Sequence, residues 1–251
     1  MCEGIRGGSI MGYIDIHNHT LPRVDDGSQS NEQSLHMLEL AYEEGFRTIV
    51  VTPHYQEGIY THSIEFIKDR LEQLRESLYD KNVDMKLLSG CEIFNSYSII
   101  DMLHKGHLLT IADSRYVLIE FMPSADYRYI KDSLYLLQLE GYIPILAHVE
   151  RYDELRKDFS MVKELVDMGI LLQVNAMSID GSSGRSISMF THKLLKKQYV
   201  HLVATDCHSD RTRSPRISKA VNIIIKKYGE AYKDRLLSDN PKLILGNQYI
   251  D

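Results

Sequence analysis

The feature that most constrains the fold is an alternation, repeated from end to end, of short apolar runs with longer amphipathic stretches. The apolar runs are three to six residues long and rich in β-branched residues, which favours buried strands over buried helices. Seven strands are therefore predicted: Tyr13–Ile16, Thr48–Val51, Lys86–Leu88, Tyr116–Phe121, Tyr142–Ala147, Ile170–Val174 and His201–Ala204. Strands that alternate with helices in this way form a parallel sheet.

The stretches between these runs carry helix-start signals. One helix is predicted to begin after Ser63, a side chain suited to the N-cap position. Its apolar stripe consists of Ile64, Ile67, Leu71, Leu74 and Leu78. Another is predicted after Ser30, where Gln33 would complete a capping box. The face of this second helix that is expected to be buried carries Leu35, Leu38 and Ala41.

Nothing in the chain marks a linker or a change of composition, so residues 12–251 are expected to form a single domain. A closed or nearly closed barrel fits seven strand–helix units in one domain. An open doubly wound sheet is the alternative, and it is disfavoured because no Gly-rich phosphate loop follows the first strand. Residues 1–11 are expected to be a disordered leader or a cloning remnant.

Composition narrows the function classes. The formal charge of -6 argues against a broad nucleic-acid-binding face, which needs clustered Lys and Arg. No apolar run approaches the ~20 residues of a membrane span, and the N-terminus lacks the apolar core of a secretory signal. Cys2, Cys91 and Cys207 form no CxxC pair, which suits a reducing compartment. We therefore expect a cytoplasmic protein that neither binds nucleic acid nor inserts directly into a membrane.

Side chains of the kind that bind metals fall at the ends of nearly all the predicted strands. They are His17, His19, Asp25, Asp26, His54, Glu92, Glu120, His148, Asp206 and His208. Each alone has an ordinary explanation, such as a cap or, for Asp25-Asp26-Gly27, a turn. Independent caps and turns would not place a His or an acidic residue at the end of nearly every strand. In a barrel, moreover, the carboxyl ends of the strands converge on one face. The sequence therefore predicts a metal centre, toward which only one of Asp25 and Asp26 is expected to point.

Imidazole and carboxylate without thiolate suit manganese, iron or zinc ions. The candidates outnumber the ligands of one ion, so two or three divalent ions are expected, with Glu92 or Asp206 as a bridge. Paired ions clamp the attacking and leaving oxygens of an in-line displacement at phosphorus. Arg151 and Arg213, near two of these strand ends, are interpreted as phosphate-binding residues. The alternative for each is a surface salt bridge, with Glu150 as the obvious partner of Arg151.

Several motifs extend the pattern beyond single residues. From about Tyr13 to Leu245 the chain contains DIHNHTLPRVDDG, VTPHY, GCEI, DSRYVLIEF, LAHVERY, LQVNAMS, LVATDCHS, HSDRTRSP and DNPKLIL. In these the sequence resembles the PHP (polymerase and histidinol phosphatase) superfamily, and most closely its bacterial capsule and exopolysaccharide tyrosine phosphatases. The His-x-His pair is common to many metallohydrolases, whereas the DDG loop, LIEF, AHVERY and the Arg of HSDRTRSP are more specific together.

The resemblance implies a distorted TIM-like (β/α)7 barrel, a trinuclear site usually served by manganese, and hydrolysis of phosphotyrosine. By motif, the implied ligands are His17, His19, Asp26, His54, Glu92, Glu120, His148, Asp206 and His208. Arg151 and Arg213 take the phosphate-binding positions. The implied protein substrate is the tyrosine-rich tail of a bacterial tyrosine autokinase that controls polysaccharide chain assembly.

Competing interpretations remain. Cys207 and Arg213 match the C-x5-R spacing of cysteine-dependent tyrosine phosphatases, but the intervening loop has no Gly, and Asp206 would raise the thiol pKa. Cys207 is therefore expected to be a spacer that points away from the site. A small-molecule phosphatase of the histidinol phosphatase type would need a deep, closed pocket, and a non-catalytic metal-binding scaffold would not need the arginines. Asn175 could line the cavity or simply begin a turn.

Overall fold

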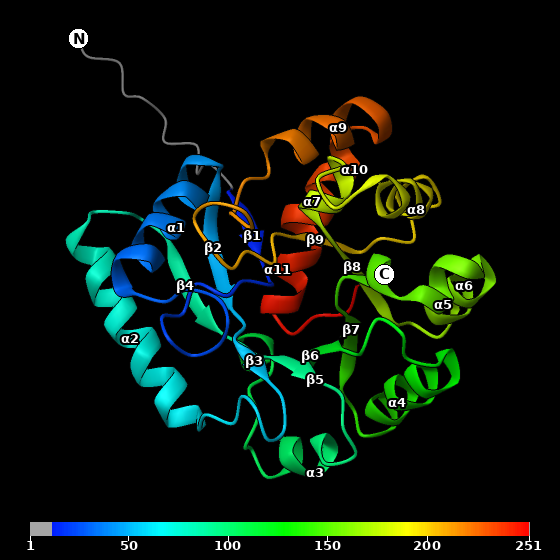
Figure 1. Ribbon diagram of the computed structural model, residues 1–251, viewed down its shortest axis with the longest axis horizontal. Helices are drawn as coiled ribbons and strands as arrows, with labels where there is room; N and C mark the ends of the chain where they lie inside the picture. Colours follow the sequence, from blue (N-terminus) through cyan, green and yellow to red (C-terminus); the bar gives the residue numbers. More distant parts are fainter. Residues whose placement is uncertain (1–11, 251) are drawn as a thin grey trace.

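Short parallel strands lie at the centre of the fold and helices surround them, in a computed structural model that describes residues 12–250 (Figure 1). The strands are β1 (Tyr13–Asp15), β2 (Phe46–Val51), β3 (His54–Tyr55), β4 (Lys86–Ser89), β5 (Glu92–Phe94), β6 (Tyr116–Glu120), β7 (Ile143–Leu146), β8 (Leu171–Asn175) and β9 (Leu202–Ala204). The predicted state of residues 1–11 lies outside the described range.

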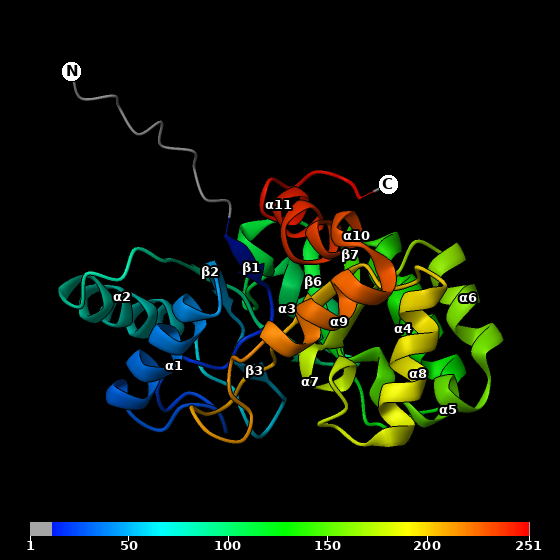
Figure 2. The ribbon, with the colours of Figure 1, turned by 90° about the horizontal axis from the view of Figure 1, so that it is seen from above.

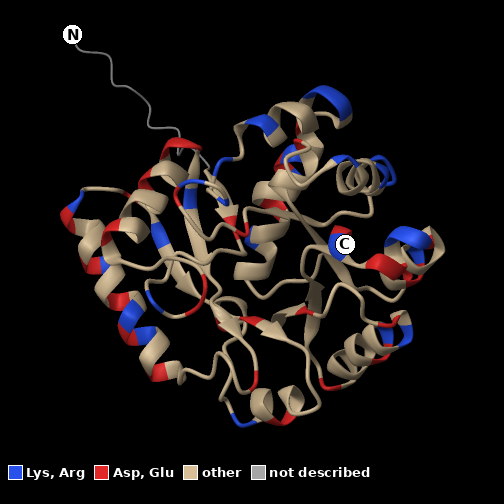
Figure 3. Ribbon diagram, viewed as in Figure 1, with Lys and Arg blue, Asp and Glu red and all other residues tan. Residues whose placement is uncertain are grey.

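Many of the Lys and Arg residues lie in the α-helices that surround the strands (Figure 3). These helices are α1 (Asn31–Glu43), α2 (Ile64–Asp80), α3 (Ile99–His104), α4 (Tyr127–Leu139), α5 (Asp153–Lys157), α6 (Phe159–Asp167), α7 (Ala176–Ile179), α8 (Arg185–Lys196), α9 (Ser218–Tyr228), α10 (Glu230–Asp234) and α11 (Asn240–Leu245). None of these helices in residues 12–250 combines the length and apolarity that crossing a bilayer requires.

The strands form two parallel sheets of order β1-β2-β4 and β3-β5-β6-β7-β8-β9. Two interrupted strands join them, because only Thr52–Pro53 separate β2 from β3 and only Gly90–Cys91 separate β4 from β5. Hydrogen bonds from Gly90 N to Val51 O (2.9 Å) and from Glu92 N to Pro53 O (3.1 Å) keep the neighbours paired across the interruption. Seven strands in chain order therefore form one curled sheet.

The two edges of this sheet meet just beyond β1 and β9. A parallel bridge joins Asn18 and Cys207, and it is flanked by hydrogen bonds from Asp206 N to His17 O (2.9 Å) and from His19 N to Cys207 O (3.0 Å). The result is a distorted (β/α)7 barrel that closes at its carboxyl end. The expected barrel is confirmed and the open doubly wound alternative is wrong.

The predicted helix starts are confirmed, with one difference. Ser63 Oγ accepts a hydrogen bond from Phe66 N (3.2 Å) and Ser30 Oγ accepts one from Gln33 N (3.2 Å). The Gln33 side chain does not return to Ser30; its Oε1 instead accepts from Gln29 N (2.9 Å), one residue earlier. The cap therefore restrains the chain that leads into α1 as well as the helix itself.

A small apolar cluster fills the barrel and leaves one end of it for the site. It consists of Ile14, Ile16, Val50, Ile111, Tyr116, Leu118, Ile145, Ala147, Leu171, Leu202, Ala204 and Ile244. Ile244 belongs to α11, which lies with the C-terminal segment at one end of the barrel, opposite the loops that follow β1 and β9 (Figure 2). The Tyr116 hydroxyl, at the start of β6, donates to Gln248 O (2.5 Å). The C-terminal segment thus covers the amino ends of the strands.

His201 lies at this covered end, just before β9, as expected from its place at the start of the last predicted strand. Its Nδ1 accepts a hydrogen bond from Leu172 N (3.0 Å), which only an unprotonated nitrogen can do. Burial, with a smaller effect of the Arg235 charge, lowers the pKa of His201 from 6.5 to about 4.

This pKa predicts a loss of stability in acid. Between pH 6.5 and 4, His201 is protonated in the unfolded chain but not in the folded chain. The free energy of unfolding should therefore fall as the pH falls through this window. We expect a contribution of roughly 2 to 3 kcal/mol, measured by urea unfolding at several pH values. His201→Gln, which keeps an acceptor but cannot titrate, should lose this contribution. An unchanged pH dependence in the variant would contradict the assignment.

Candidate metal centre

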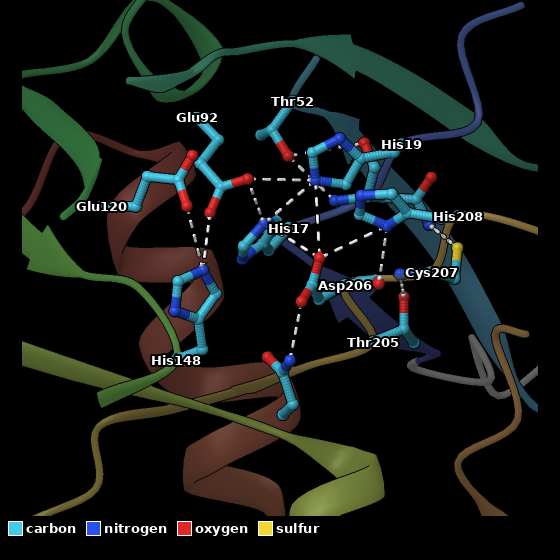
Figure 4. Close-up of polar contacts among 12 residues, drawn as sticks. His17, His19, Thr52, Glu92, Glu120, His148, Thr205, Asp206, Cys207 and His208 are labelled. Atoms are coloured by element: carbon cyan, nitrogen blue, oxygen red, sulfur yellow. Dashed lines mark hydrogen bonds and ion pairs between the residues drawn. The ribbon is translucent and has the colours of Figure 1, made fainter. Parts of the chain in front are cut away.

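The nine residues predicted as ligands all meet at the carboxyl end of the barrel. Figure 4 shows side chains that follow β1 and β9 directed toward others at β5, β6 and just after β7. Glu92 and His54 open β5 and β3 directly after the strand interruptions, and Glu120 ends β6. The structure therefore brings the strand-end residues together as parallel strand geometry requires.

The Glu92 carboxylate is the centre of this cluster, and it is fully buried. Its Oε2 lies 3.0 Å from His17 Nε2, 3.2 Å from His19 Nε2 and 3.1 Å from His54 Nδ1. Its Oε1 lies 2.9 Å from His148 Nε2. Oε1 forms a hydrogen bond with His148 Nε2, whereas Oε2 has no hydrogen-bond partner although three nitrogens are this close to it.

Unpaired, buried donor atoms are what a bound cation would satisfy. His208 Nε2 is also buried and has no hydrogen-bond partner, and His17 Nε2 lies 3.1 Å from His19 Nε2. Three sets of side chains have donor atoms within 4.8 Å of one another: His19, His54 and His208; His17, His19, Glu92 and Asp206; and His54, Glu92 and Glu120. The sets share His19, His54 and Glu92, so neighbouring ions would share ligands. The donor set fits divalent metal ions.

Asp25 and Asp26 approach the cluster from opposite sides. Asp25 is behind it: its Oδ2 lies 2.7 Å from His19 Nδ1 and accepts from His54 N (3.0 Å). Asp26 is at the mouth, where its side chain is 56% exposed and its Oδ1 is 3.5 Å from the Nε2 atoms of His54 and His208. Both carboxylates contact histidines, in place of the single inward-pointing aspartate expected. Asp25 fixes the His19 ring so that Nε2 faces the cluster.

The cluster's charges depend strongly on one another. Burial alone would raise the pKa of Glu92, but the neighbouring His17, His19 and His148 rings hold it well below its ordinary value. Burial likewise opposes a charge on His54, yet Glu120 and Glu92 raise the pKa of His54 to about 9. Without a cation, protons on the imidazoles balance the carboxylates. Metal ions compete with these protons for the same lone pairs.

Two amide side chains on β8 complete the arrangement, and the sequence argument missed one of them. Gln173 Oε1 lies 3.1 Å from His17 Nδ1 and accepts from His148 N (2.9 Å). Gln173 Nε2 donates to Asn175 Oδ1 (2.8 Å), and Asn175 Nδ2 donates to Asp206 Oδ2 (2.7 Å). The Asn175 side chain therefore contacts the cluster; Asn175 also directly precedes α7, where its side chain makes no capping hydrogen bond. The available signal was two amides at alternate positions of an otherwise apolar strand.

Asp15, at the end of β1, was also missed. Its carboxylate is buried and accepts from Thr205 N (3.1 Å), Thr205 Oγ1 (2.5 Å) and Asn18 Nδ2 (3.1 Å). It thereby ties the end of β1 to the end of β9, directly beneath His17 and Asp206. A charged residue in a buried strand, two positions before His-x-His, was the signal that could have revealed it.

The backbone at these strand ends is itself unusual. His148 and Asp206 have positive φ angles of 33° and 50°. Residues other than Gly rarely adopt this backbone conformation, which costs about 1 to 3 kcal/mol each. Close approach also explains Gly27, where a Cβ atom would lie 2.3 Å from His19 O. The surrounding hydrogen bonds hold the chain in these conformations and set the direction of the side chains.

The two predicted arginines both contact Asp206. Arg151 Nη2 lies 2.7 Å from Asp206 Oδ2, and Arg213 Nη2 lies 2.7 Å from Asp206 Oδ1. The alternative in which Arg151 pairs with Glu150 is wrong, because Glu150 is buried and accepts from Asn175 N (2.9 Å) instead. Both guanidinium groups remain partly exposed and lie beside the cluster at its open side.

Cys207 faces away from the cavity, as expected. Its thiol is buried and lies 3.1 Å from Asn18 Nδ2. Burial, reinforced by the nearby Asp15 and Asp206 charges, raises the pKa of the Cys207 thiol. A buried thiol that resists ionisation is a poor nucleophile, so the geometry does not support a cysteine-dependent phosphatase.

A parallel barrel with histidines and carboxylates gathered at the carboxyl strand ends is the architecture of metal-dependent barrel hydrolases. Residues 13–246 match the family described as "Capsular polysaccharide synthesis, CpsB/CapC". The chain belongs to this family. It is 35% identical to tyrosine-protein phosphatase YwqE of Bacillus subtilis over 237 residues, 94% of this chain and 93% of that protein. It is 36% identical to tyrosine-protein phosphatase CpsB of Streptococcus pneumoniae over 242 residues, 94% of this chain and 100% of that protein.

Solved structures agree with this placement. A structure described as one of "YwqE from Bacillus subtilis and CpsB from Streptococcus pneumoniae, unique metal-dependent tyrosine phosphatases" aligns with a TM-score of 0.90 at 34% identity, over 95% of this chain and 96% of that one. The phosphotriesterase homology protein of Escherichia coli aligns with a TM-score of 0.60 at 12% identity, over 95% of this chain and 100% of that one. The second likeness shows the shared barrel fold alone.

Removal of the Asn175 amide tests the role of β8. Asn175→Ala should weaken Mn²⁺ binding to chelator-treated protein about tenfold in isothermal titration calorimetry, because Asp206 and Gln173 lose the partner that orients them. Asn95→Ala is the matched control, since Asn95 bonds to Tyr129 and Ser133 rather than to the cluster. Equal Mn²⁺ affinity in the two variants would contradict a positioning role for Asn175.

Proposed function

We propose that this protein is a metal-dependent protein-tyrosine phosphatase, which hydrolyses the phosphate monoester of phosphotyrosine. The observation that carries the proposal is the convergence of imidazole nitrogens on the buried Glu92 carboxylate, whose Oε2 has no hydrogen-bond partner, with two guanidinium groups nearby. The relatives YwqE and CpsB carry the name tyrosine-protein phosphatase, which supports the same activity here.

The metal ligands in this proposal are His17, His19, Asp26, His54, Glu92, Glu120, His148, Asp206 and His208. Their number and the overlap of the three donor sets support two or three divalent ions, between which Glu92 or Asp206 would be shared. Manganese is the proposed metal, and iron or zinc would suit the same nitrogen and oxygen ligands. The bound ions supply the Lewis acidity that activates water and offsets phosphoryl charge.

Arg151 and Arg213 are the proposed phosphate-binding residues. Asp206 holds both guanidinium groups at 2.7 Å, so they are already oriented at the edge of the cluster before a substrate arrives. Each fork of N–H donors can bind non-bridging phosphate oxygens and stabilise the charge that grows on them in the transition state. A phenolate, with a pKa of about 10, leaves more readily than an alkoxide, so strong general-acid assistance is not required.

A protein substrate suits the site better than a small molecule. Asp26 and the two arginines are reachable from solvent at the mouth, whereas a small-molecule phosphatase would enclose its substrate in a deep pocket. The proposed substrate is the tyrosine-rich tail of a bacterial tyrosine autokinase that regulates capsule or exopolysaccharide synthesis. A cytoplasmic location goes with this proposal, in keeping with the free thiols of Cys91 and Cys207.

Activity with and without metal tests the proposal. The protein with Mn²⁺ should hydrolyse para-nitrophenyl phosphate, and a chelator should abolish turnover. Glu92→Gln should be inactive and hold less metal, because the bridging carboxylate is lost, whereas Cys207→Ser should keep most of the activity. An inactive Cys207→Ser protein with full metal content would overturn this mechanism. Faster hydrolysis of histidinol phosphate than of a phosphotyrosyl peptide would favour a small-molecule phosphatase. Absence of hydrolysis of any of these substrates would favour a non-catalytic metal-binding scaffold.

Substitution of the arginines tests phosphate binding separately from metal binding. Arg151→Ala and Arg213→Ala should each lower kcat/KM about 100-fold or more, the size of a lost oxyanion-type donor. Metal content should not fall, because each change removes a positive charge next to Asp206. Arg211→Ala is the matched control, since Arg211 is exposed and makes no contact with Asp206 within the described chain. Wild-type kinetics in either variant would mean that the substituted arginine forms only a surface salt bridge and does not bind phosphate.

A further inference from the structure

Three large apolar side chains are exposed on the loops that surround one side of the metal centre. Ile59 follows β3, Tyr97 follows β5 and Met122 follows β6, so they belong to three neighbouring strands of one sheet. Their exposed fractions are 63%, 97% and 57%. His54 opens β3, Glu92 opens β5 and Glu120 ends β6, all at the carboxyl end of the barrel. The three apolar residues follow these strands and therefore lie on the same face as the candidate ligands.

Hydrogen bonds hold the first two loops together. The Glu57 carboxylate accepts from Ser98 Oγ (2.9 Å) and Ser96 Oγ (3.3 Å), which joins the loop after β3 to the loop after β5. Within the first loop, Gln56 and Tyr60 pair as an antiparallel bridge, with N–O distances of 2.9 and 3.1 Å. The loop that carries Ile59 is therefore a small, closed structure with a fixed neighbour.

Aromatic contacts extend the connection to the third loop. The Tyr97 and Tyr129 rings lie 6.4 Å apart, and Phe121 meets Tyr129 edge-on at 5.6 Å. Asn95 Nδ2 donates to the Tyr129 hydroxyl (2.8 Å), which fixes that ring. Met122 follows Phe121 directly, so all three exposed side chains stand on one connected framework.

The same framework reaches the metal centre. The Tyr60 ring stacks on the His54 ring, with centroids 5.8 Å apart and an interplanar angle of 19°. Residue Ile59, which precedes Tyr60, therefore lies next to a side chain that covers a candidate ligand. The loop that carries Ile59 is therefore in direct contact with the candidate metal centre.

These loops carry almost no charge. Residues 56–60, 95–98 and 121–125 contain no Lys or Arg and a single acid, Glu57, whose carboxylate already accepts two hydrogen bonds. Such a surface offers nothing to an acidic segment and gains from burying apolar groups. A chain that binds across it should present uncharged, apolar side chains.

We propose that Ile59, Tyr97 and Met122 form an apolar rim that binds uncharged, apolar side chains next to the phosphotyrosine of a polypeptide substrate. The rim selects the sequence around the phosphotyrosine, while the metal centre and the arginines act on the phosphate. This inference rests on the proposed phosphatase function and adds the sequence class of its substrate.

The test compares two phosphotyrosyl peptides that differ only at the residues flanking phosphotyrosine, with Leu in one and Glu in the other. The wild-type protein with Mn²⁺ should show a kcat/KM at least about tenfold higher for the Leu peptide. The triple variant Ile59→Ser, Tyr97→Ser, Met122→Ser should lose most of this preference. Its activity on para-nitrophenyl phosphate, which has no flanking residues, should stay at the wild-type level.

A triple variant with exposed apolar residues replaced on outer helices is the matched control: Tyr79→Ser on α2 with Tyr135→Ser and Leu139→Ser on α4. It should keep the full preference for the Leu peptide. Equal kcat/KM for the two peptides in the wild-type protein would overturn the proposed role of the rim. An equal loss of activity on the Leu peptide, the Glu peptide and para-nitrophenyl phosphate in the rim variant would overturn it as well. Concentration-dependent dimerisation that the rim variant abolishes would assign the surface to a second copy of the chain instead. Absence of wild-type activity on para-nitrophenyl phosphate, by contrast, would refute the phosphatase function itself.

Discussion

The burial of the Glu92 carboxylate among imidazoles is the interaction on which the rest of this structure depends. An ionised group without solvent is stable only where opposite charge or hydrogen bonds surround it. Four histidine rings lie within 3.2 Å of its two oxygens, and these rings come from three different strand ends, since His17 and His19 both follow β1. Each of those strands must therefore end at the right height and direction. The barrel provides this because its strands are parallel and its edges close just beyond β1 and β9.

A second set of polar groups keeps this arrangement in place. Asp15 ties the first strand to the last, Asp25 supports His19, and Gln173 with Asn175 links His17 to Asp206. These residues need not touch a metal ion or a substrate, yet each fixes the orientation of one that is proposed to do so. Two of the positions they support have positive φ angles, so the hydrogen bonds also offset local backbone strain.

The sequence was sufficient for the barrel and for the nine clustered residues, since strand–helix alternation and strand-end position are both visible in a single chain. It was not sufficient for the supporting groups. Gln173 and Asp15 are ordinary polar residues within strands, and only the closed barrel shows which ligand each one faces. The role of Asp25 was also hidden, because two adjacent aspartates in one loop look equivalent until the loop is folded. Long-range partners of this kind depend on register across the barrel, which no local pattern encodes.

The interruptions at Thr52–Pro53 and Gly90–Cys91 divide each of two adjacent strands into a lower segment and an upper segment with different roles. The first parts, β2 and β4, pair with each other and pack in the core, whereas the second parts, β3 and β5, pair with each other and present His54 and Glu92. Each interruption gives the polypeptide a place to change direction without breaking the pairing beneath it. The residues that present the ligands can consequently differ without altering the pairing of β2 with β4, whereas Tyr55 and Ile93, which are buried in the core, make the stability of the barrel depend on the upper segments as well.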